Sequence, residues 1–278
     1  MPDVPLPPPA AGAGPPPPPP PATTPVPPPP PPNLTAPPGY VGVTPTPIGS
    51  AGLYRIGKLT KAAVALTAAS AAVTLISIVA LQAAQDDAQL LLDDSIDVET
   101  FVRRALPYLL MTVLQAVATL AAAIVTMIWM FRIAKNHRTL HRGGTWGPGW
   151  AIGGWFLPPL LYVIPSLMLR ELWKASDPDV PIGGDWKSNR TSALVPVWFV
   201  LYSLVPLGLL FAQSSGGFAS FGASERDLAQ QIVDGQTSTV TAAVVSVAGA
   251  IAFVALALGI DRRHRRLTGE SAPAVVRS

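Results

Sequence analysis

The chain of 278 residues has no cysteine and little charge. The absence of cysteine excludes disulfide bonds, thiolate metal sites and cysteine nucleophiles. Charged residues make up 13% of the chain, whereas about a quarter is usual for soluble domains. The sequence also lacks a Walker A motif and the nucleophile elbow of acyl-transfer enzymes. We therefore predict no catalytic residue, no cofactor and no metal site. The mean hydropathy of +0.39 argues against an ordinary globular enzyme and favours a membrane domain.

Proline is concentrated at the start of the chain, where residues 1–49 hold 23 of the 33 prolines. Proline fixes φ and has no backbone N–H to donate, which leaves extended polyproline II as the available local structure. The scattered apolar residues of this stretch are too few to bury a core. We predict a disordered Pro-rich tail over residues 1–49. It would either dock into an aromatic-lined groove of a cytoplasmic protein partner or act as a solvated spacer.

Residues 50–265 are interpreted as an all-α membrane domain because five long windows lack charged side chains. The windows are residues 62–84, 105–131, 143–169, 191–224 and 235–260. A membrane crossing needs about 20 helical residues. We expect four transmembrane helices, followed by a short cytoplasmic tail over residues 266–278. The expected helices lie at about 60–84, 105–131, 192–213 and 237–260.

The middle window is interrupted by glycine and proline, which break helices. Within a bilayer, the freed backbone groups need partners in protein or in a wet cavity. We therefore expect a Pro-broken elbow over about residues 149–175 that is either re-entrant or interfacial. A short helix would start at Trp150 and break at Pro158–Pro159. A second helix would run from about Leu160 to Ala175, with Pro159 in its first turn.

The distribution of Lys and Arg decides whether this elbow crosses the membrane, because basic residues accumulate in cytoplasmic loops. If the elbow does not cross, 16 of the 19 basic residues lie on the cytoplasmic side. If it crosses, 8 lie inside and 11 outside. We therefore predict a multi-pass plasma-membrane protein with four spans and both termini in the cytoplasm.

The stretch from Trp129 to Asp177 is the most distinctive part of the sequence. It reads WMFRIAKNHRTL, then a Gly-rich turn, then GWAIGGWFLPPLLYVIPSLMLRELWKASDP. It resembles the membrane family of domain of unknown function 4328, found mainly in actinobacteria, whose members often carry a Pro-rich or Gly-rich N-terminal tail. The residues that carry the resemblance are Arg132, Asn136, Leu140, Trp146, Gly149, Trp150, Trp155, Phe156, Pro158, Pro165, Glu171, Leu172, Trp173, Ser176 and Asp177. The resemblance implies the architecture of residues 50–265 and transfers no catalytic residue.

From this stretch we select candidate residues for a functional or structural role of the elbow. They are Arg132, Asn136, Trp150, Trp155, Pro158, Pro165, Glu171, Trp173 and Asp177. Aromatic rings favour the headgroup level of a bilayer. The elbow is therefore interpreted either as a vestibule or lipid-contact surface, or as a packing plug that braces the helices.

Two of the three histidines, His137 and His141, stand four residues apart and would share a face of a continuous helix, as two metal ligands would. Arg138 and Arg142 beside them would repel a cation, so we interpret these histidines as basic interfacial residues. His264 is assigned likewise to the basic cluster near the end of the chain. That cluster is interpreted as an orientation signal at the lipid headgroups and not as a nucleic-acid site.

The leading hypothesis is a non-enzymatic scaffold or tether that recruits a cytoplasmic protein through its Pro-rich tail. One alternative is a small-molecule or ion permease subunit with the elbow as its gate. Another is a lipid-interacting membrane enzyme that uses Arg132, Asn136 and Glu171 at the cytoplasmic interface. The expected partners are the lipid bilayer, a cytoplasmic protein and a second copy of the chain, because small residues such as Ala68 and Ala72 allow close helix approach.

Overall fold

The computed structural model describes residues 52–157, 160–181, 183–208 and 224–270, and every regular element in these ranges is helical. Three long helices dominate: α1 (Gly57–Leu92), α2 (Val98–Thr139) and α8 (Gln236–Leu267). All three are long and apolar enough to cross a membrane. In the apolar windows of α1 and α2 only 11% of the residues are buried inside the protein. Their apolar side chains therefore face outward, as lipid favours and water does not.

The sequence predicts four crossing helices, and the structure corrects this number to three for the residues it describes. The expected span at about 192–213 is a helix followed from Leu194 to Gly208, and the rest of that span lies outside the described residues. A helix from 194 to 208 rises about 22 Å, which is less than the bilayer core of about 30 Å. It starts as α5 (Leu194–Phe199) and continues through a π-helical turn, η3 (Val200–Leu204). That turn lies just before Pro206, and proline is a common cause of helix kinks.

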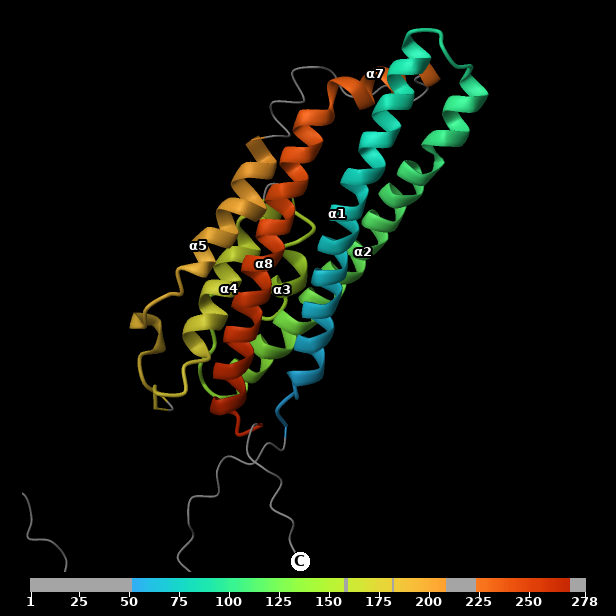
Figure 1. Cartoon of the computed structure of the whole chain (residues 1–278). Coiled ribbons are helices and arrows are strands. Elements are labelled where there is room, and N and C mark those ends of the chain that lie inside the picture. The colour runs from blue at the N-terminus through green and yellow to red at the C-terminus, as the bar shows by residue number, and fades with distance from the viewer. Residues whose placement is uncertain (1–51, 158–159, 182, 209–223, 271–278) are drawn as a thin grey trace, which may run out of the picture. The chain divides into compact units, whose positions relative to one another are not determined.

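The long helices pack side by side in the order α2, α1, α8, with α5 on the other side of α8 (Figure 1). α1 and α2 are joined by a short turn, and the Asp97 side chain caps α2 by accepting from the Thr100 N–H at 3.1 Å. A further helix, α7 (Glu225–Asp234), packs against α1 near the turn that joins α1 to α2. The chain thus forms a helical bundle whose connections differ greatly in length.

The segment between α2 and α5 holds the expected elbow in altered form. It contains α3 (Trp150–Gly153), η1 (Leu160–Tyr162), α4 (Ile164–Ala175) and η2 (Trp186–Ser188). A short helix does start at Trp150, but the second helix begins at Ile164 and not at about Leu160. Pro165 occupies its first turn, where the missing N–H costs no hydrogen bond. The sequence assigns that place to Pro159, which with Pro158 lies outside the described residues.

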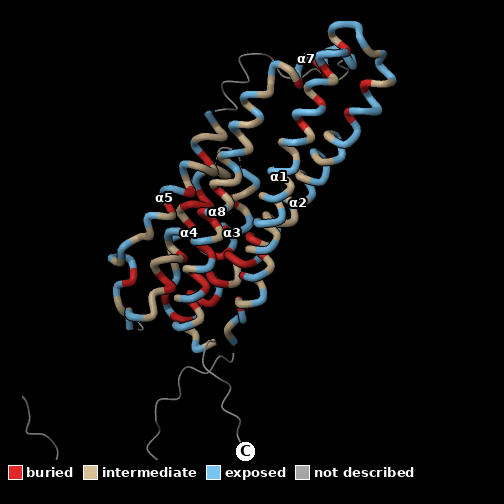
Figure 2. The backbone as a smooth tube through the Cα atoms, in the orientation of Figure 1, coloured by how far each residue is buried: buried red, intermediate tan, exposed pale blue. Residues whose placement is uncertain are grey.

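The buried residues form two separate clusters (Figure 2). The larger lies where α1 begins, α2 and α8 end, and the elbow packs; Trp129 and Met168 belong to it. The smaller lies where α1 ends, α2 begins and α7 packs, and includes Phe101 and Ile232. Asn136, Glu171, Trp173 and Asp177, four of the candidate functional residues, lie at the end of the bundle that holds the larger cluster. The middle of the bundle, between the two clusters, contains a cavity.

Candidate functional site

The last turn of α2 carries two buried polar side chains, Asn136 and His137, which are 0% and 3% exposed. Oδ1 of Asn136 accepts from the Tyr54 N–H at 2.8 Å, and its Nδ2 donates to the Tyr54 carbonyl at 2.8 Å. These two bonds fix the orientation of the amide, so its Nδ2 also faces Nε2 of His264, 2.9 Å away. The chain just before α1 is thereby tied to the ends of α2 and α8.

His264 is a neutral imidazole in this arrangement. Its Nε2 must accept from the Asn136 amide, so its proton lies on Nδ1, which has no partner among the described residues. The ring lies edge-on to His137, with centroids 5.2 Å apart. Nε2 of His137 lies 3.1 Å from the hydroxyl of Ser176, which is 0% exposed. The two rings therefore connect α2 and α8 to the end of α4.

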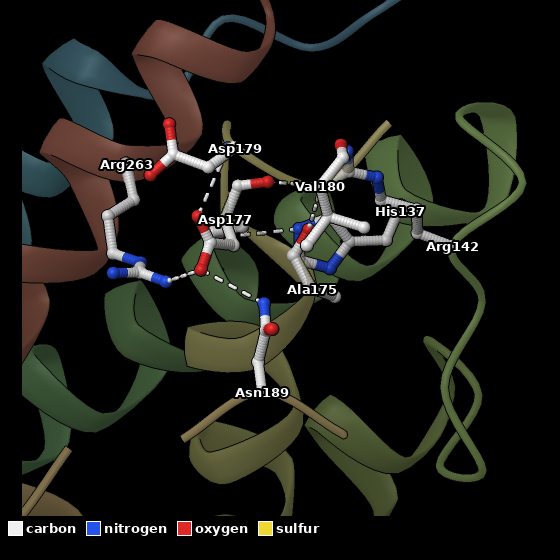
Figure 3. A network of polar contacts seen from close by, with 9 residues as sticks. His137, Arg142, Ala175, Asp177, Asp179, Val180, Asn189 and Arg263 are labelled. Atoms are coloured by element: carbon white, nitrogen blue, oxygen red, sulfur yellow. Dashed lines mark hydrogen bonds and ion pairs between the residues drawn. The ribbon is translucent and has the colours of Figure 1, made fainter. Parts of the chain in front are cut away.

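Arg142, three residues beyond α2, is buried and holds the end of α4 by its backbone (Figure 3). Its guanidinium donates to the carbonyls of Ala175 at 3.0 Å and Asp177 at 2.6 Å, and to that of Val180. Burial lowers the pKa of Arg142, and the Asp177 carboxylate opposes this shift. Because Arg142 precedes the elbow and Ala175 ends it, the elbow leaves and returns to the same end of the bundle.

Asp177 connects the elbow to α8 (Figure 3). Its carboxylate pairs with Arg263 at 2.6 Å and accepts from the Asn189 amide at 2.9 Å. The Arg263 guanidinium also lies over the Trp173 ring, 4.8 Å from its centroid. Asp177 is therefore a paired carboxylate that closes the loop after α4.

Glu171 supports the turn that enters the elbow. Its two carboxylate oxygens accept from the N–H groups of Thr145 at 3.0 Å and Trp146 at 3.1 Å. A Cβ on Gly144 would lie 2.0 Å from Oε2 of Glu171. Any side chain at this position would therefore displace the Glu171 carboxylate from its two hydrogen bonds.

A second polar group ties the three long helices together one turn deeper. The indole N–H of Trp129 on α2 donates to the Thr60 hydroxyl on α1 at 2.9 Å. That hydroxyl lies 2.8 Å from Oδ1 of Asp261 on α8. Beyond it, the Glu270 carboxylate accepts from the first backbone N–H groups of α1, at Ile56 and Gly57, each at 3.2 Å. These contacts stabilise the α1 N-terminus, which favours a negative group.

A cavity of about 450 Å³ lies farther along the bundle, at the middle of the long helices. Its walls come from α1, α2, α8, the helix that begins at Leu194, and the elbow residues Trp155, Leu161 and Tyr162. Its described lining contains no charged residue. The elbow therefore reaches from the polar end of the bundle to the cavity.

The family model of Domain of unknown function (DUF4328) matches residues 93–262, more than half of the 278 residues. The chain belongs to the DUF4328 family. This confirms the resemblance drawn from the stretch between Trp129 and Asp177. No curated protein and no solved structure matches the chain. The DUF4328 match includes α2, the elbow and α5, whereas Tyr54 and His264 lie outside it.

In this DUF4328 protein the predicted candidates separate into three groups. Asn136, Glu171, Trp173 and Asp177 belong to the polar contacts at the end of the bundle, and Arg132 lies over the Tyr54 ring at 5.7 Å. Trp155 lines the cavity, Trp150 is 37% exposed and Pro165 is buried in α4. Pro158 lies outside the described residues.

The histidine prediction is wrong in its pairing. α2 ends at Thr139, and His141 follows with φ 55°, so the helix does not continue through both His137 and His141. His137 faces His264 instead, and both are buried, not interfacial. No group of three or more His, Cys, Asp or Glu side chains that could hold a metal occurs in the described ranges.

Sequence reasoning missed His264, Arg142 and Ser176 as members of this site. A signal existed in α8, because its buried residues recur every three or four positions up to His264. They are Gly249, Ala252, Phe253, Leu256, Ala257, Ile260, Asp261 and His264. Because arginines flank His264 on both sides, its place on this buried face was not recognised from the sequence.

Proposed function

We propose that this DUF4328 protein is a non-enzymatic scaffold of the plasma membrane that presents its Pro-rich segment to a cytoplasmic protein partner. The single observation that carries the proposal is the attachment of Tyr54 to Asn136, five residues after the Pro-rich stretch ends. A tether needs a fixed attachment point on the membrane domain, and here that point is Tyr54. A buried amide with two backbone bonds to Tyr54 is a means of fixing it.

The contacts around Tyr54 support a rigid attachment. Asn136 binds Tyr54 and His264 at once, and Glu270 caps the first turn of α1. Arg142 and Asp177 fasten the elbow to the same end. Polar contacts made inside a low-dielectric region are electrostatically stronger than the same contacts in water. The segment at Tyr54, the elbow and α8 would thus move together as one rigid unit.

We further propose the topology that the basic residues favour. The helix that begins at Leu194 would start a fourth crossing, the elbow would re-enter from the cytoplasmic side, and both termini would lie in the cytoplasm. The hydrogen bond from Arg142 to Ala175 supports the re-entrant path, because it joins the two ends of the elbow. Ala68 and Ala72 are exposed on α1, which leaves a face of small residues for self-association.

The scaffold is tested by placing a photoreactive amino acid at Thr24, within the Pro-rich segment, in the full chain in its native membrane. We expect one discrete crosslinked protein. It should disappear when Pro27–Pro32 are replaced by alternating Gly and Ser, which removes polyproline II. Replacement of Ala10–Gly14, a stretch without proline, by Gly and Ser is the control and should keep the adduct. An adduct that survives loss of the prolines would overturn the proposal.

A small-molecule permease with the elbow as gate is the second candidate, favoured by the cavity against Trp155, Leu161 and Tyr162. Deletion of residues 1–49 separates the two, because it removes the partner of a scaffold and leaves the flux of a permease unchanged. The lipid-interacting enzyme has less support. Its three expected residues all make structural contacts. Arg132 and Asn136 both contact Tyr54, Asn136 also contacts His264, and Glu171 accepts from the turn at Thr145.

A further inference from the structure

A charged pocket lies where the last turns of α8 meet the end of α4 and the loop that follows it. Its volume of about 350 Å³ falls within the roughly 300–1,000 Å³ of small-molecule sites. Its lining includes three arginines from α8 and two aspartates from the loop. These five side chains leave the lining with one net positive charge. The pocket therefore suits a ligand that carries one negative charge.

Two of the arginines in the lining, Arg262 and Arg266, have no protein partner. Both are exposed, and neither makes a hydrogen bond or an ion pair with another described residue. They stand four residues apart on α8, so their side chains lie on one face of the helix. A guanidinium presents its N–H donors in a planar fork that matches the oxygens of a phosphate. Two such groups without a partner, on one pocket, favour a phosphate as the ligand.

The third arginine, Arg263, is held in place by the protein. It pairs with the Asp177 carboxylate at 2.6 Å (Figure 3), and its guanidinium lies 4.8 Å from the centroid of the Trp173 ring. Asp177 neutralises Arg263, so the free positive charge comes from the other two arginines. Asp179 is the second carboxylate of the lining and is exposed. It would repel a second negative charge on a ligand, so the pocket favours a phosphodiester over a phosphate monoester.

The pocket lies at the boundary between the apolar and the charged part of α8. The helix has no charged side chain over Gln236–Ile260, and its charged end follows directly. α8 is long and apolar enough to cross a membrane, so in a bilayer this boundary falls at the headgroup level. Leu258 is exposed one turn before Arg262, and Ile251 is exposed two turns before Leu258. Acyl chains can contact this apolar face, whereas a free phosphate has no apolar part.

We propose that this pocket binds the phosphodiester of an anionic phospholipid that carries one net charge. The phosphate accepts from the guanidinium groups of Arg262 and Arg266, and the acyl chains lie along the face that contains Leu258. Trp173 lines the pocket at the level where indole rings favour a bilayer. The bound lipid joins α8 to the loop after α4, because both contribute to the lining. The site does not involve the Pro-rich segment, and it can form on either side of the membrane.

The experiment uses the purified full chain in a non-ionic detergent and counts bound lipids by native mass spectrometry. Phosphatidylglycerol is the probe, and phosphatidylcholine, which has a phosphodiester but no net charge, is the comparison. We expect one phosphatidylglycerol per chain, bound at least about fivefold more tightly than phosphatidylcholine, the effect of about one basic residue near a headgroup. Equal binding of the two lipids would overturn the proposal. Displacement of phosphatidylglycerol by an equal concentration of inorganic phosphate would show a site for the free anion, and would overturn it as well.

Two variants locate the phosphate. Arg262→Gln and Arg266→Gln should each weaken the binding of phosphatidylglycerol about fivefold, and the double variant about 30-fold. The matched control is the double variant Arg55→Gln and Arg170→Gln, because both arginines are exposed and lie outside the lining. It loses the same charge and should bind as the wild type does. An equal loss in the two double variants would contradict the site. If the pocket variants fail to fold, the comparison of the two lipids on the wild-type chain decides.

Discussion

The side-chain amide of Asn136 is hydrogen-bonded to both backbone groups of Tyr54, 82 residues earlier in the chain. The same amide reaches His264, 128 residues later. One residue on α2 thus joins the segment before α1 to the end of α8.

Replacing Asn136 by Leu should loosen the segment before α1. The change removes three hydrogen bonds and leaves the buried Nε2 of His264 without a donor, at a cost of about 1–3 kcal/mol. Thermal unfolding in detergent should occur at lower temperature, and trypsin should cleave faster after Arg55, next to Tyr54. Gln230→Leu on exposed α7 is the control. Unchanged cleavage after Arg55 in the Asn136 variant would mean that the amide does not fix this segment.

Arg142→Lys should destabilise the elbow although it keeps the charge. The guanidinium donates to three carbonyls through two nitrogens, and a single lysine ammonium cannot reproduce that planar geometry. We expect a loss of about 1.5–3 kcal/mol in the free energy of unfolding, measured by denaturant titration in detergent. Arg138→Lys, on an exposed side chain in the last turn of α2, should change little. Equal effects of the two substitutions would contradict the role of Arg142.

Gly259→Ala should destabilise the packing of α4 on α8. Alanine normally favours a helix over glycine by about 1 kcal/mol, but a Cβ at this position would lie 2.6 Å from the Trp173 ring. That ring is held by Arg263, so the clash should outweigh the helix preference and lower the unfolding temperature. Gly153→Ala has open space around its Cβ and should be neutral or stabilising. A stabilised Gly259→Ala protein would show that Trp173 is free to move.

The start of α7 should weaken in acid. Hydrogen bonds from the Ser224 backbone and hydroxyl lower the pKa of Asp227 below its ordinary value of 3.8. A lowered pKa means that the stabilisation is present above about pH 4 and is lost as the pH falls through the folded-state pKa. Hydrogen exchange at the first turn of α7 should therefore accelerate at low pH. In Asp227→Asn the exchange should lose this pH dependence once the intrinsic rate is corrected.

Hydropathy and proline placement predict much of the fold but little of the site. Apolar windows locate α1, α2 and α8, and the prolines place a break between α3 and α4, because burial and backbone geometry are local constraints. The expected span at about 192–213 is described only from Leu194 to Gly208, and an uncharged window does not reveal the π turn inside this helix. The contact of Asn136 with His264 depends on how helices far apart in sequence meet. In the sequence His264 stands among arginines and was therefore assigned to their basic cluster. The periodicity of α8 instead places it on the buried face of the helix.

The absence of native cysteine permits the most direct test of the account, which is single-cysteine labelling with a membrane-impermeant maleimide. Ser95, Gly143 and Ser188 are exposed and lie after α1, before the elbow and after it. We expect Ser95→Cys to be labelled in intact cells, whereas Gly143→Cys and Ser188→Cys should be labelled only after permeabilisation. Labelling of Gly143→Cys and Ser188→Cys from opposite sides of the membrane would contradict a re-entrant elbow and the cytoplasmic scaffold built on it.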